Sequence, residues 1–354
     1  MNNDESDGGR SPEQPSPARI PIGVPPVGPP PEDWRPGTQV HPPGPITIGP
    51  PQPSSASVQP PSSIRRNVIL FVLTLLTTSY WGFLQYQFFY LDNLGEPVLN
   101  PFGEPMLWLA GLPYAMAVIA FLSAHEMGHY LACRYYGIRA TLPYFIPIPP
   151  VGPILLPGTM GAVIRIKSPI KGRRELFDIA VAGPLAGFIA ALPMLAVGLG
   201  QSRVVDEGSL GFGIGLGEPL IWGPLQAAFA PPVGPGQTLV AHPLAFVGWF
   251  ALLVTAMNLL PIGQLDGGHL LYAVTPRHHR KISMLLVALM LFAGYRYFSG
   301  WILFAVLILF ALGTKHPQPL TFEGILGPGR RLLLLLAILI LVTSFTLEPI
   351  RINF

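Results

Sequence analysis

Charged residues and cysteine are the two classes that this sequence has least of. Only 11% of its 354 residues are Asp, Glu, Lys or Arg, whereas 50% are hydrophobic. Soluble domains carry about 25% charged residues, so this composition excludes an ordinary soluble protein and predicts several membrane-spanning segments. The lone cysteine, Cys133, excludes an intramolecular disulfide. We expect it to be a packed small side chain; a reactive thiol is the alternative.

The N-terminal region also lacks long apolar runs. Its first nine residues are polar and acidic, so we expect no secretory signal peptide. Proline, glycine and serine dominate residues 1–63, and such a segment cannot bury enough apolar surface to offset its ordering entropy. We therefore predict a disordered, proline-rich cytoplasmic tail, which is either solvated or a docking site for a partner.

Apolar runs in the rest of the chain predict about six to seven transmembrane helices. Lysine and arginine gather beside alternate ends of these runs, as membrane orientation requires, and this places the N-terminus in the cytoplasm. The basic residues therefore need no nucleic-acid partner. The fifth and sixth runs are short and form either two spans or one span with an interfacial piece. The runs cover residues 68–91, 106–136, 176–199, 244–260, 283–298, 301–313 and 332–345.

The second run contains the motif His125-Glu126-Met127-Gly128-His129. Histidines four residues apart share one face of a helix, so their imidazoles can bind one Zn²⁺ while Glu126 acts on a zinc-activated water. No charged side chain occurs in residues 106–124, which places these ionisable groups at membrane depth, where they are costly and usually functional. The alternative is that the three polar side chains pair with one another or face a water cavity.

The fourth span follows His242 and Pro243. Its apolar run is interrupted at residues 258–269, where Pro261 and several glycines occur, and it resumes over residues 270–274. Proline removes a helical hydrogen bond, and broken membrane helices mark binding sites. We expect Asp266, at the same depth as His125 and His129, to be the third metal ligand. The alternatives are a helix cap or a pair with His269.

Three further polar residues lie in or beside this fourth span. Asn258 is expected to donate a hydrogen bond to the developing oxyanion or the substrate backbone; an inter-helix amide bond is the alternative. His269 is a candidate for orienting a metal ligand. We do not expect His242 to bind the metal, because it lies at the outer end of the run.

Residues 140–174 form a loop that is rich in proline and glycine yet largely apolar. Its end, residues 161–167, alternates apolar and polar residues and predicts a short strand or hairpin. Irregular backbone is tolerated at membrane depth only where protein or a water cavity covers it. We therefore expect either a membrane-dipping loop beside the metal or a surface loop that rests on the bilayer.

Three motifs occur in one order: HExxH in a membrane span, Gly183-Pro-Leu-Ala-Gly187, and Asn258-Leu-Leu-Pro261 followed by Leu265-Asp266-Gly267. Together they resemble the site-2 protease family of intramembrane zinc metalloproteases, over about residues 106–280. The resemblance implies a three-span catalytic core, Zn²⁺ held by the two histidines and the aspartate, and Glu126 as the base. It also implies single-span membrane-protein substrates and regulated proteolysis. Many relatives carry a PDZ domain, but residues 200–241 are too short and too rich in glycine and proline to be one.

The predicted fold is therefore an all-α polytopic membrane protein. Four parts follow: a disordered tail (1–63), a first transmembrane helix with an outer loop (64–105), the intramembrane metalloprotease core (106–280) and C-terminal transmembrane helices (281–354).

We expect a zinc endopeptidase in the lipid bilayer of a bacterial cytoplasmic membrane, with its active site toward the cytoplasm. Two other classes stay open: a metal transporter or sensor that uses the same ligands, and a non-catalytic adaptor that acts through the tail.

Overall fold

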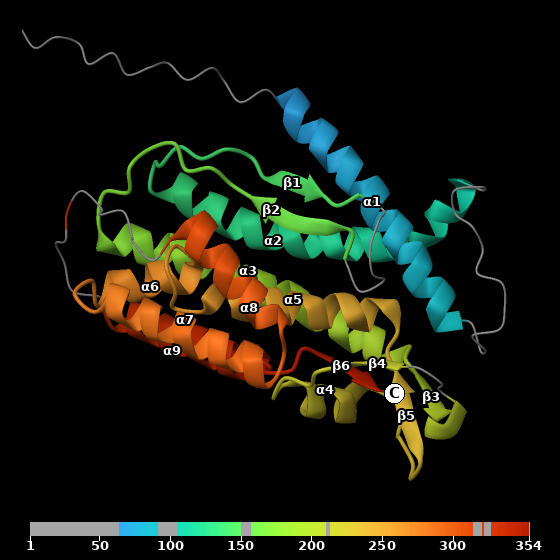
Figure 1. Ribbon diagram of the computed structural model, residues 1–354. Helices are drawn as coiled ribbons and strands as arrows, with labels where there is room; N and C mark the ends of the chain where they lie inside the picture. The colour runs from blue at the N-terminus through green and yellow to red at the C-terminus, as the bar shows by residue number, and fades with distance from the viewer. Residues whose placement is uncertain are drawn as a thin grey trace, which may run out of the picture. The chain divides into compact units, whose positions relative to one another are not determined.

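The computed structural model describes residues 64–90, 105–149, 157–209, 213–313, 321 and 327–353. They fall within one unit of the chain, Pro60–Phe354, and are mostly helical (Figure 1). The predicted tail at residues 1–63 lies outside the described residues. So do most of the predicted outer loop at 92–105 and part of the loop at 140–174.

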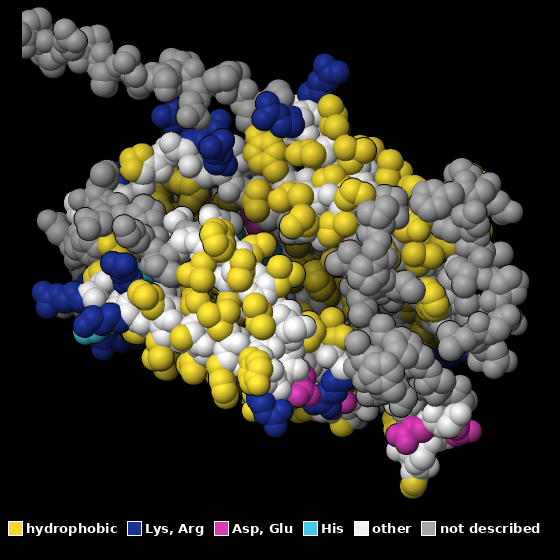
Figure 2. Space-filling view, in the orientation of Figure 1, with side chains coloured by type: hydrophobic (Ala, Val, Ile, Leu, Met, Phe, Trp, Pro, Cys, Tyr) yellow, Lys and Arg dark blue, Asp and Glu magenta, His cyan; other side chains and the backbone are white. Residues whose placement is uncertain are grey.

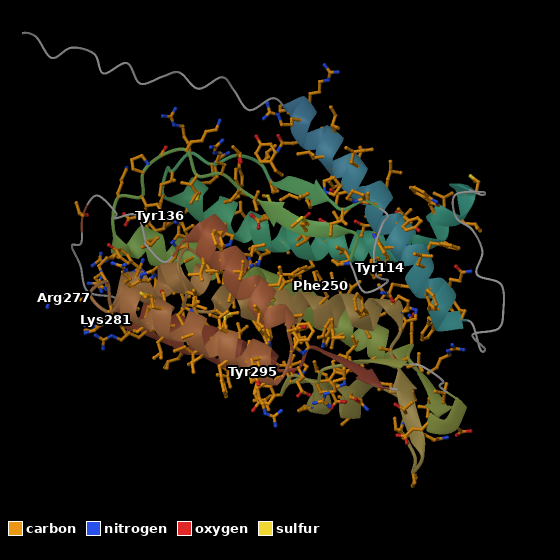
Figure 3. All side chains as sticks on the ribbon, viewed as in Figure 1. Tyr114, Tyr136, Phe250, Arg277, Lys281 and Tyr295 are labelled. Carbon is orange, nitrogen blue, oxygen red and sulfur yellow. The ribbon has the colours of Figure 1, made fainter. Side chains whose placement is uncertain are left out.

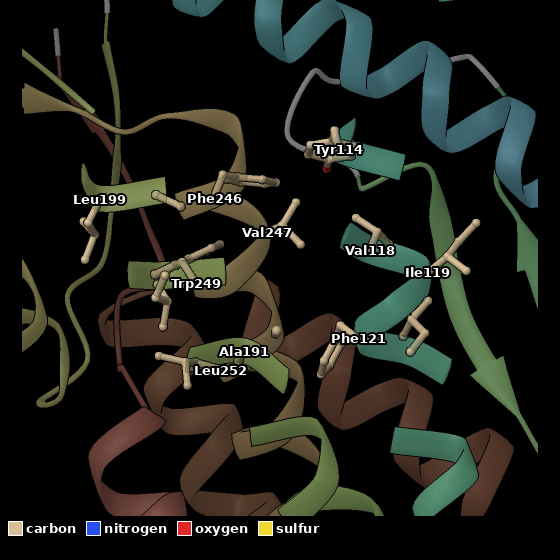
Figure 4. Close-up of a cluster of buried hydrophobic side chains, with 14 of the residues drawn as sticks. Tyr114, Val118, Ile119, Phe121, Ala191, Leu199, Phe246, Val247, Trp249 and Leu252 are labelled. Atoms are coloured by element: carbon tan, nitrogen blue, oxygen red, sulfur yellow. The ribbon is translucent and has the colours of Figure 1, made fainter. Parts of the chain in front are cut away.

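Helix α3 (Arg173–Gly200) packs along both α2 (Leu112–Tyr135) and α5 (Pro243–Leu259). The helices approach closely where glycine faces a neighbour: a Cβ on Gly128 would overlap the α3 backbone, and one on Gly198 would overlap the α5 backbone. Small residues allow such packing between membrane helices. Figure 4 shows the buried apolar cluster that the three helices share, which includes Tyr114, Val118, Phe121, Ala191, Phe246, Trp249 and Leu252.

A hairpin follows α2, in the loop where the alternating pattern predicts one. Strand β1 (Tyr144–Pro147) pairs antiparallel with β2 (Thr159–Val163), and an isolated bridge joins Ala140 to Ile166. The regular strand begins and ends earlier than the predicted 161–167, because its partner β1 determines where the ladder forms. Helix α1 (Ile64–Tyr90) holds the hairpin through hydrogen bonds from Asn67 to the carbonyl of Pro143 (2.9 Å) and from Thr77 to that of Gly158 (2.9 Å).

The predicted break in the fourth run is present. Helix α5 ends at Leu259, and α6 (Asp266–Val274) begins four residues earlier than the predicted restart at Leu270. The turn between them contains Gly263 with a φ of +53°, a conformation that favours glycine. Helix α7 (His279–Arg296) holds this turn, because Ser283 accepts from the Gly263 N–H at 3.2 Å and His279 contacts the Gly263 carbonyl at 3.1 Å.

Among the described residues, three helical segments are long and apolar enough to cross a membrane: Ile64–Tyr90, Met106–Tyr135 and Arg173–Gly200. The second comprises the short helix η1 (Pro105–Gly111) and α2. Two more, Pro243–Leu259 and Gly300–Phe310, are apolar but shorter. The C-terminal helices are α8 (Gly300–Leu307), η3 (Ile308–Leu312) and α9 (Pro328–Ser344). The chain is thus a membrane protein, but the predicted count of six to seven spans is not confirmed.

Residues 200–241, predicted to be a loop, contain short regular elements. They are β3 (Arg203–Asp206), η2 (Glu207–Ser209), β4 (Gly213–Leu216), α4 (Trp222–Phe229) and β5 (Gln237–Val240). Strand β3 pairs with β5, whereas β4 pairs with the C-terminal strand β6 (Ile350–Asn353). The all-α prediction is therefore incomplete. The β4 sequence is short and glycine-containing, and its partner lies far along the chain, so no local pattern indicates the pairing.

Charged side chains lie mainly at the margins of the face seen in Figure 2. Hydrophobic side chains cover much of this face, whereas Lys and Arg occur at its upper and left margins and, beside acidic groups, near its lower edge. Arg277 and Lys281 lie at the left in Figure 3, as does Tyr136 at the end of α2, whereas Tyr114 at its start lies to the right.

An ion pair ties α9 to α3 near the end of α2. Arg330 donates to both carboxylate oxygens of Asp178, at 2.6 Å and 2.9 Å, and its side chain is 27% exposed. The hydroxyl of Tyr136 donates to Asp178 as well. Burial and the Asp178 carboxylate raise the pKa of Tyr136, which keeps this hydroxyl a donor. Bidentate arginine–carboxylate pairs of this kind are stronger than single hydrogen bonds.

We expect Arg330→Met to lower the free energy of unfolding by about 1.5–3 kcal/mol, the range for hydrogen bonds to charged groups. The measurement is thermal unfolding of the purified chain in detergent. Arg331→Met is the matched control, because Arg331 is the exposed neighbour on the same helix. Equal unfolding temperatures for the two variants would contradict a stabilising role for the Arg330 pair.

Candidate metal centre

Helix α2 presents the HExxH residues inside the protein. His125 is 3% exposed, and Glu126 and His129 are each 8% exposed. The helix continues without interruption through the motif, so the two imidazoles lie one turn apart on the same face. Their Nε2 atoms are 3.2 Å apart. The predicted helical geometry of the motif is therefore confirmed.

Asp266, the first residue of α6, brings its carboxylate to the same two rings. Its Oδ2 lies 3.4 Å from His125 Nε2 and 3.3 Å from His129 Nε2. In a tetrahedral zinc site with bonds of about 2.0–2.1 Å, two ligand atoms lie about 3.3 Å apart. The spacing of the three atoms therefore fits one face of such a tetrahedron, so these residues could hold a metal ion.

The alternatives for these residues can be compared with the geometry. The three side chains contact one another, as the pairing alternative held, and their nearly equal spacing also fits a shared cation. Asp266 does not cap α6: the N-cap position is Leu265, and no side-chain cap hydrogen bond occurs there. Two neutral imidazoles and one carboxylate are also a donor set that suits Zn²⁺.

The Gly-x-x-x-Gly segment of α3 makes room for the imidazoles. A Cβ on Gly183 would overlap the His129 ring at Nε2, and one on Gly187 would lie 3.0 Å from His125 Nδ1. The sequence indicated close helix packing at these glycines, and the structure shows that both of them face the candidate metal ligands. Any side chain at position 183 would displace a donor atom.

Glycine also allows α6 to start close to the end of α5. A Cβ on Gly267 would overlap the carbonyl of Leu259, and one on Gly268 would overlap that of Gly263. Because neither residue has a side chain, the turn can be short, and Asp266 reaches the two histidines. The Leu-Asp-Gly motif thus positions the carboxylate through its glycines.

His129 and Glu126 each have a backbone partner that the sequence did not reveal. The Nδ1–H of His129 donates to the carbonyl of Ile179 at 2.7 Å, which leaves Nε2 to face the other donors. Glu126 Oε2 accepts from the N–H of Ile164 at 2.9 Å. Ile164 directly follows β2, so the hairpin lies beside the HExxH helix, as one of the two predictions for the loop required.

Asn258 lies next to the same group of side chains. Its Nδ2 is 3.4 Å from His125 Nε2, and the residue is half-buried near the end of α5. This contact joins α5 to α2, so the Asn258 amide does make an inter-helix contact, as the alternative interpretation held. The atom that it contacts is nevertheless one of the three converging donors, so the side chain is also within reach of a group bound there.

The remaining candidates from the sequence are not among the three converging ligand residues. The buried His242 caps α5, accepting from the Leu244 N–H at 3.2 Å, and is not among the converging donors. Burial lowers its pKa, which favours the neutral ring that can accept this bond. His269 lies on α6 one turn after Asp266, and its predicted orienting role stays a prediction. Cys133 is a buried free thiol, in agreement with a packed side chain.

Comparison with known proteins gives an independent assignment. The model for peptidase family M50 matches residues 113–295, just over half of the chain. The chain is 35% identical over 187 residues to the probable zinc metalloprotease EGY1, chloroplastic, of Oryza sativa subsp. japonica, which covers 49% of this chain and 29% of that protein. It is 33% identical over 227 residues to EGY1 of Arabidopsis thaliana, covering 57% and 38%.

A third relative covers more of the chain. The probable zinc metalloprotease EGY2, chloroplastic, of Oryza sativa subsp. indica is 29% identical over 237 residues, which is 65% of this chain and 41% of that protein. The chain thus spans less than half the length of these relatives. The family match contains the HExxH helix, the glycine segment and the broken helix with Asp266. The chain belongs to peptidase family M50, the site-2 protease family of zinc metalloproteases.

Proposed function

We propose that this chain is an intramembrane zinc endopeptidase that cleaves peptide bonds in or near the transmembrane helices of single-span membrane proteins. The observation that carries this proposal is the convergence of His125, His129 and Asp266 at 3.2–3.4 Å beside Glu126. Membership in peptidase family M50 and the names of the relatives support it.

The residues divide the chemistry among them. His125, His129 and Asp266 would hold Zn²⁺, which supplies a Lewis acid that activates water and polarises the scissile carbonyl. Glu126 takes the proton of the attacking water and delivers it to the leaving amine. The Ile164 N–H holds the Glu126 carboxylate for this transfer. Asn258 donates a hydrogen bond to the developing oxyanion or to the substrate backbone.

A metal transporter or sensor would use the same ligands but would not need Glu126 as a base. We therefore expect Glu126→Gln to keep stoichiometric zinc and to lower kcat for a membrane substrate by about 10²–10⁴-fold, the contribution of a general base. The measurements are elemental analysis and cleavage in detergent or vesicles. Glu207→Gln, at an exposed site, is the control.

Cleavage by the Glu126→Gln variant at the rate of the unaltered chain would contradict the role of Glu126. Zinc flux across proteoliposomes that survives this substitution would favour the transporter instead.

The glycine beneath His129 gives a test of the metal ligands. We expect Gly183→Ala to abolish zinc binding, because the added methyl group would occupy the space of the His129 ring at its donor atom. Gly223→Ala is the matched control, since a Cβ there would meet no atom within 4 Å. Zinc content is measured by elemental analysis and helix content by circular dichroism. Full zinc occupancy in Gly183→Ala would contradict the assignment of His129.

The substrate must unwind before cleavage, because a membrane helix satisfies its own backbone. We propose that the unwound segment adds as a strand to the β1–β2 hairpin. Replacing Ile164, which directly follows β2, with proline would disturb strand pairing there. It would also remove the N–H that holds Glu126, so a loss of cleavage would not test strand addition alone. A contact test is better suited, since Cys133 is a buried, lone cysteine.

With Cys133 replaced by alanine, we expect Met160→Cys on β2 to form a disulfide with a cysteine placed near the cut site of a substrate. Met160 is 69% exposed. Met284→Cys, on α7 and 54% exposed, is the control and should not react. Crosslinking is read on a denaturing gel; equal yields at the two positions would contradict strand addition.

The proposal also includes the orientation of the enzyme and the membrane in which it lies. We propose that the end of the protein near Arg277 and Lys281, with the HExxH half of α2, faces the cytoplasm, as the basic residues there predict. The relatives are named chloroplastic, and the predicted bacterial membrane stays a prediction. The same holds for regulated proteolysis, for the absence of a PDZ domain and for a partner of the proline-rich tail.

A further inference from the structure

The two candidate histidine ligands differ at the ring nitrogen that faces away from the metal position. His129 Nδ1 has a partner, the carbonyl of Ile179. His125 Nδ1 is buried and has no hydrogen-bond partner within the part of the chain that the structure describes. Metal-bound histidines almost always donate this second N–H to a carboxylate, a carbonyl or a water. A buried donor without a partner is also costly.

A second buried polar atom without a partner in the described segments lies next to His125. It is the hydroxyl oxygen of Thr255 on α5, whose residue is 0% exposed. Both atoms lie close to Gly187. From the point that a Cβ on Gly187 would occupy, His125 Nδ1 is 3.0 Å away and Thr255 Oγ1 is 3.4 Å away.

This geometry suits one bridging water. The two atoms do not bond each other directly, yet both are close to one point. A water that bonds two polar groups at once is enthalpically nearly as good as a direct hydrogen bond between them. Buried waters occupy sites that offer several polar partners and enough room. Here both unpartnered atoms adjoin Gly187.

We propose that Thr255 is a positioning residue for the metal centre. A buried water accepts the Nδ1–H of His125 and donates to Thr255 Oγ1. This hydrogen bond holds the proton on Nδ1, so that His125 Nε2 keeps its lone pair for the metal. The role rests on the proposed function, because it concerns the same zinc ligands.

The experiment measures the zinc affinity of the full chain, purified in detergent, by competition with a chelator. Thr255→Val keeps the shape of the side chain and removes the hydroxyl, and we expect it to weaken zinc binding by about 10–100-fold, the usual effect of losing such a partner. Thr255→Ser, which keeps the hydroxyl, should restore the affinity of the unaltered chain. Because affinity is the readout, substrate is not required.

Thr74→Val is the matched control. Thr74 is also 0% exposed, and its hydroxyl also has no partner among the described residues, but it lies on α1, which carries none of the three candidate ligands. This variant should bind zinc as the unaltered chain does. A loss of the same size in Thr74→Val would show a general effect of the substitution and overturn the proposal.

Unchanged affinity in Thr255→Val, or failure of Thr255→Ser to restore it, would overturn the positioning role. Failure of the unaltered chain to bind zinc at all would contradict the proposed function, and this role with it.

Discussion

Two imidazoles and a carboxylate lie together among apolar helices, and the surrounding structure holds them in contact with one another. Ionisable side chains are costly in such surroundings unless each is paired or bound to a cation. His125, His129 and Asp266 meet this requirement jointly, because their donor atoms are almost equally spaced around one position. One divalent cation there would neutralise the carboxylate and satisfy both rings. Without such a cation, the Asp266 carboxylate would have the two imidazoles as its contacts in this apolar setting.

Backbone atoms and glycines hold this group in place, so few other polar side chains are needed. The carbonyl of Ile179 orients His129, and the N–H of Ile164 orients Glu126. Gly183 and Gly187 leave space for the rings, while Gly267 and Gly268 let Asp266 approach them. Backbone groups are fixed by the elements that carry them, so they hold ligands without the entropy cost of ordering long side chains.

The site also connects parts of the chain that are distant in sequence. Ile179 follows Asp178, whose carboxylate binds Arg330 of α9, 152 residues away. The hairpin reaches Glu126 from one side, and Ser283 of α7 holds the turn before Asp266 from another. The C-terminal helix and the hairpin are thus part of the same packing arrangement as the HExxH helix, although α9 lies outside the family match.

The sequence alone determined the HExxH helix, the long apolar spans and the break at Pro261. These depend on local rules: the helical repeat, the cost of charge in a membrane and the missing N–H of proline. It also indicated Asp266, because depth along a span can be counted. Only the tertiary structure decided that Gly183 faces the candidate metal ligand His129, that the Ile164 N–H meets Glu126 and that β4 pairs with β6. Such contacts join segments far apart in the chain, and their energies come from packing that leaves no periodic pattern in either segment.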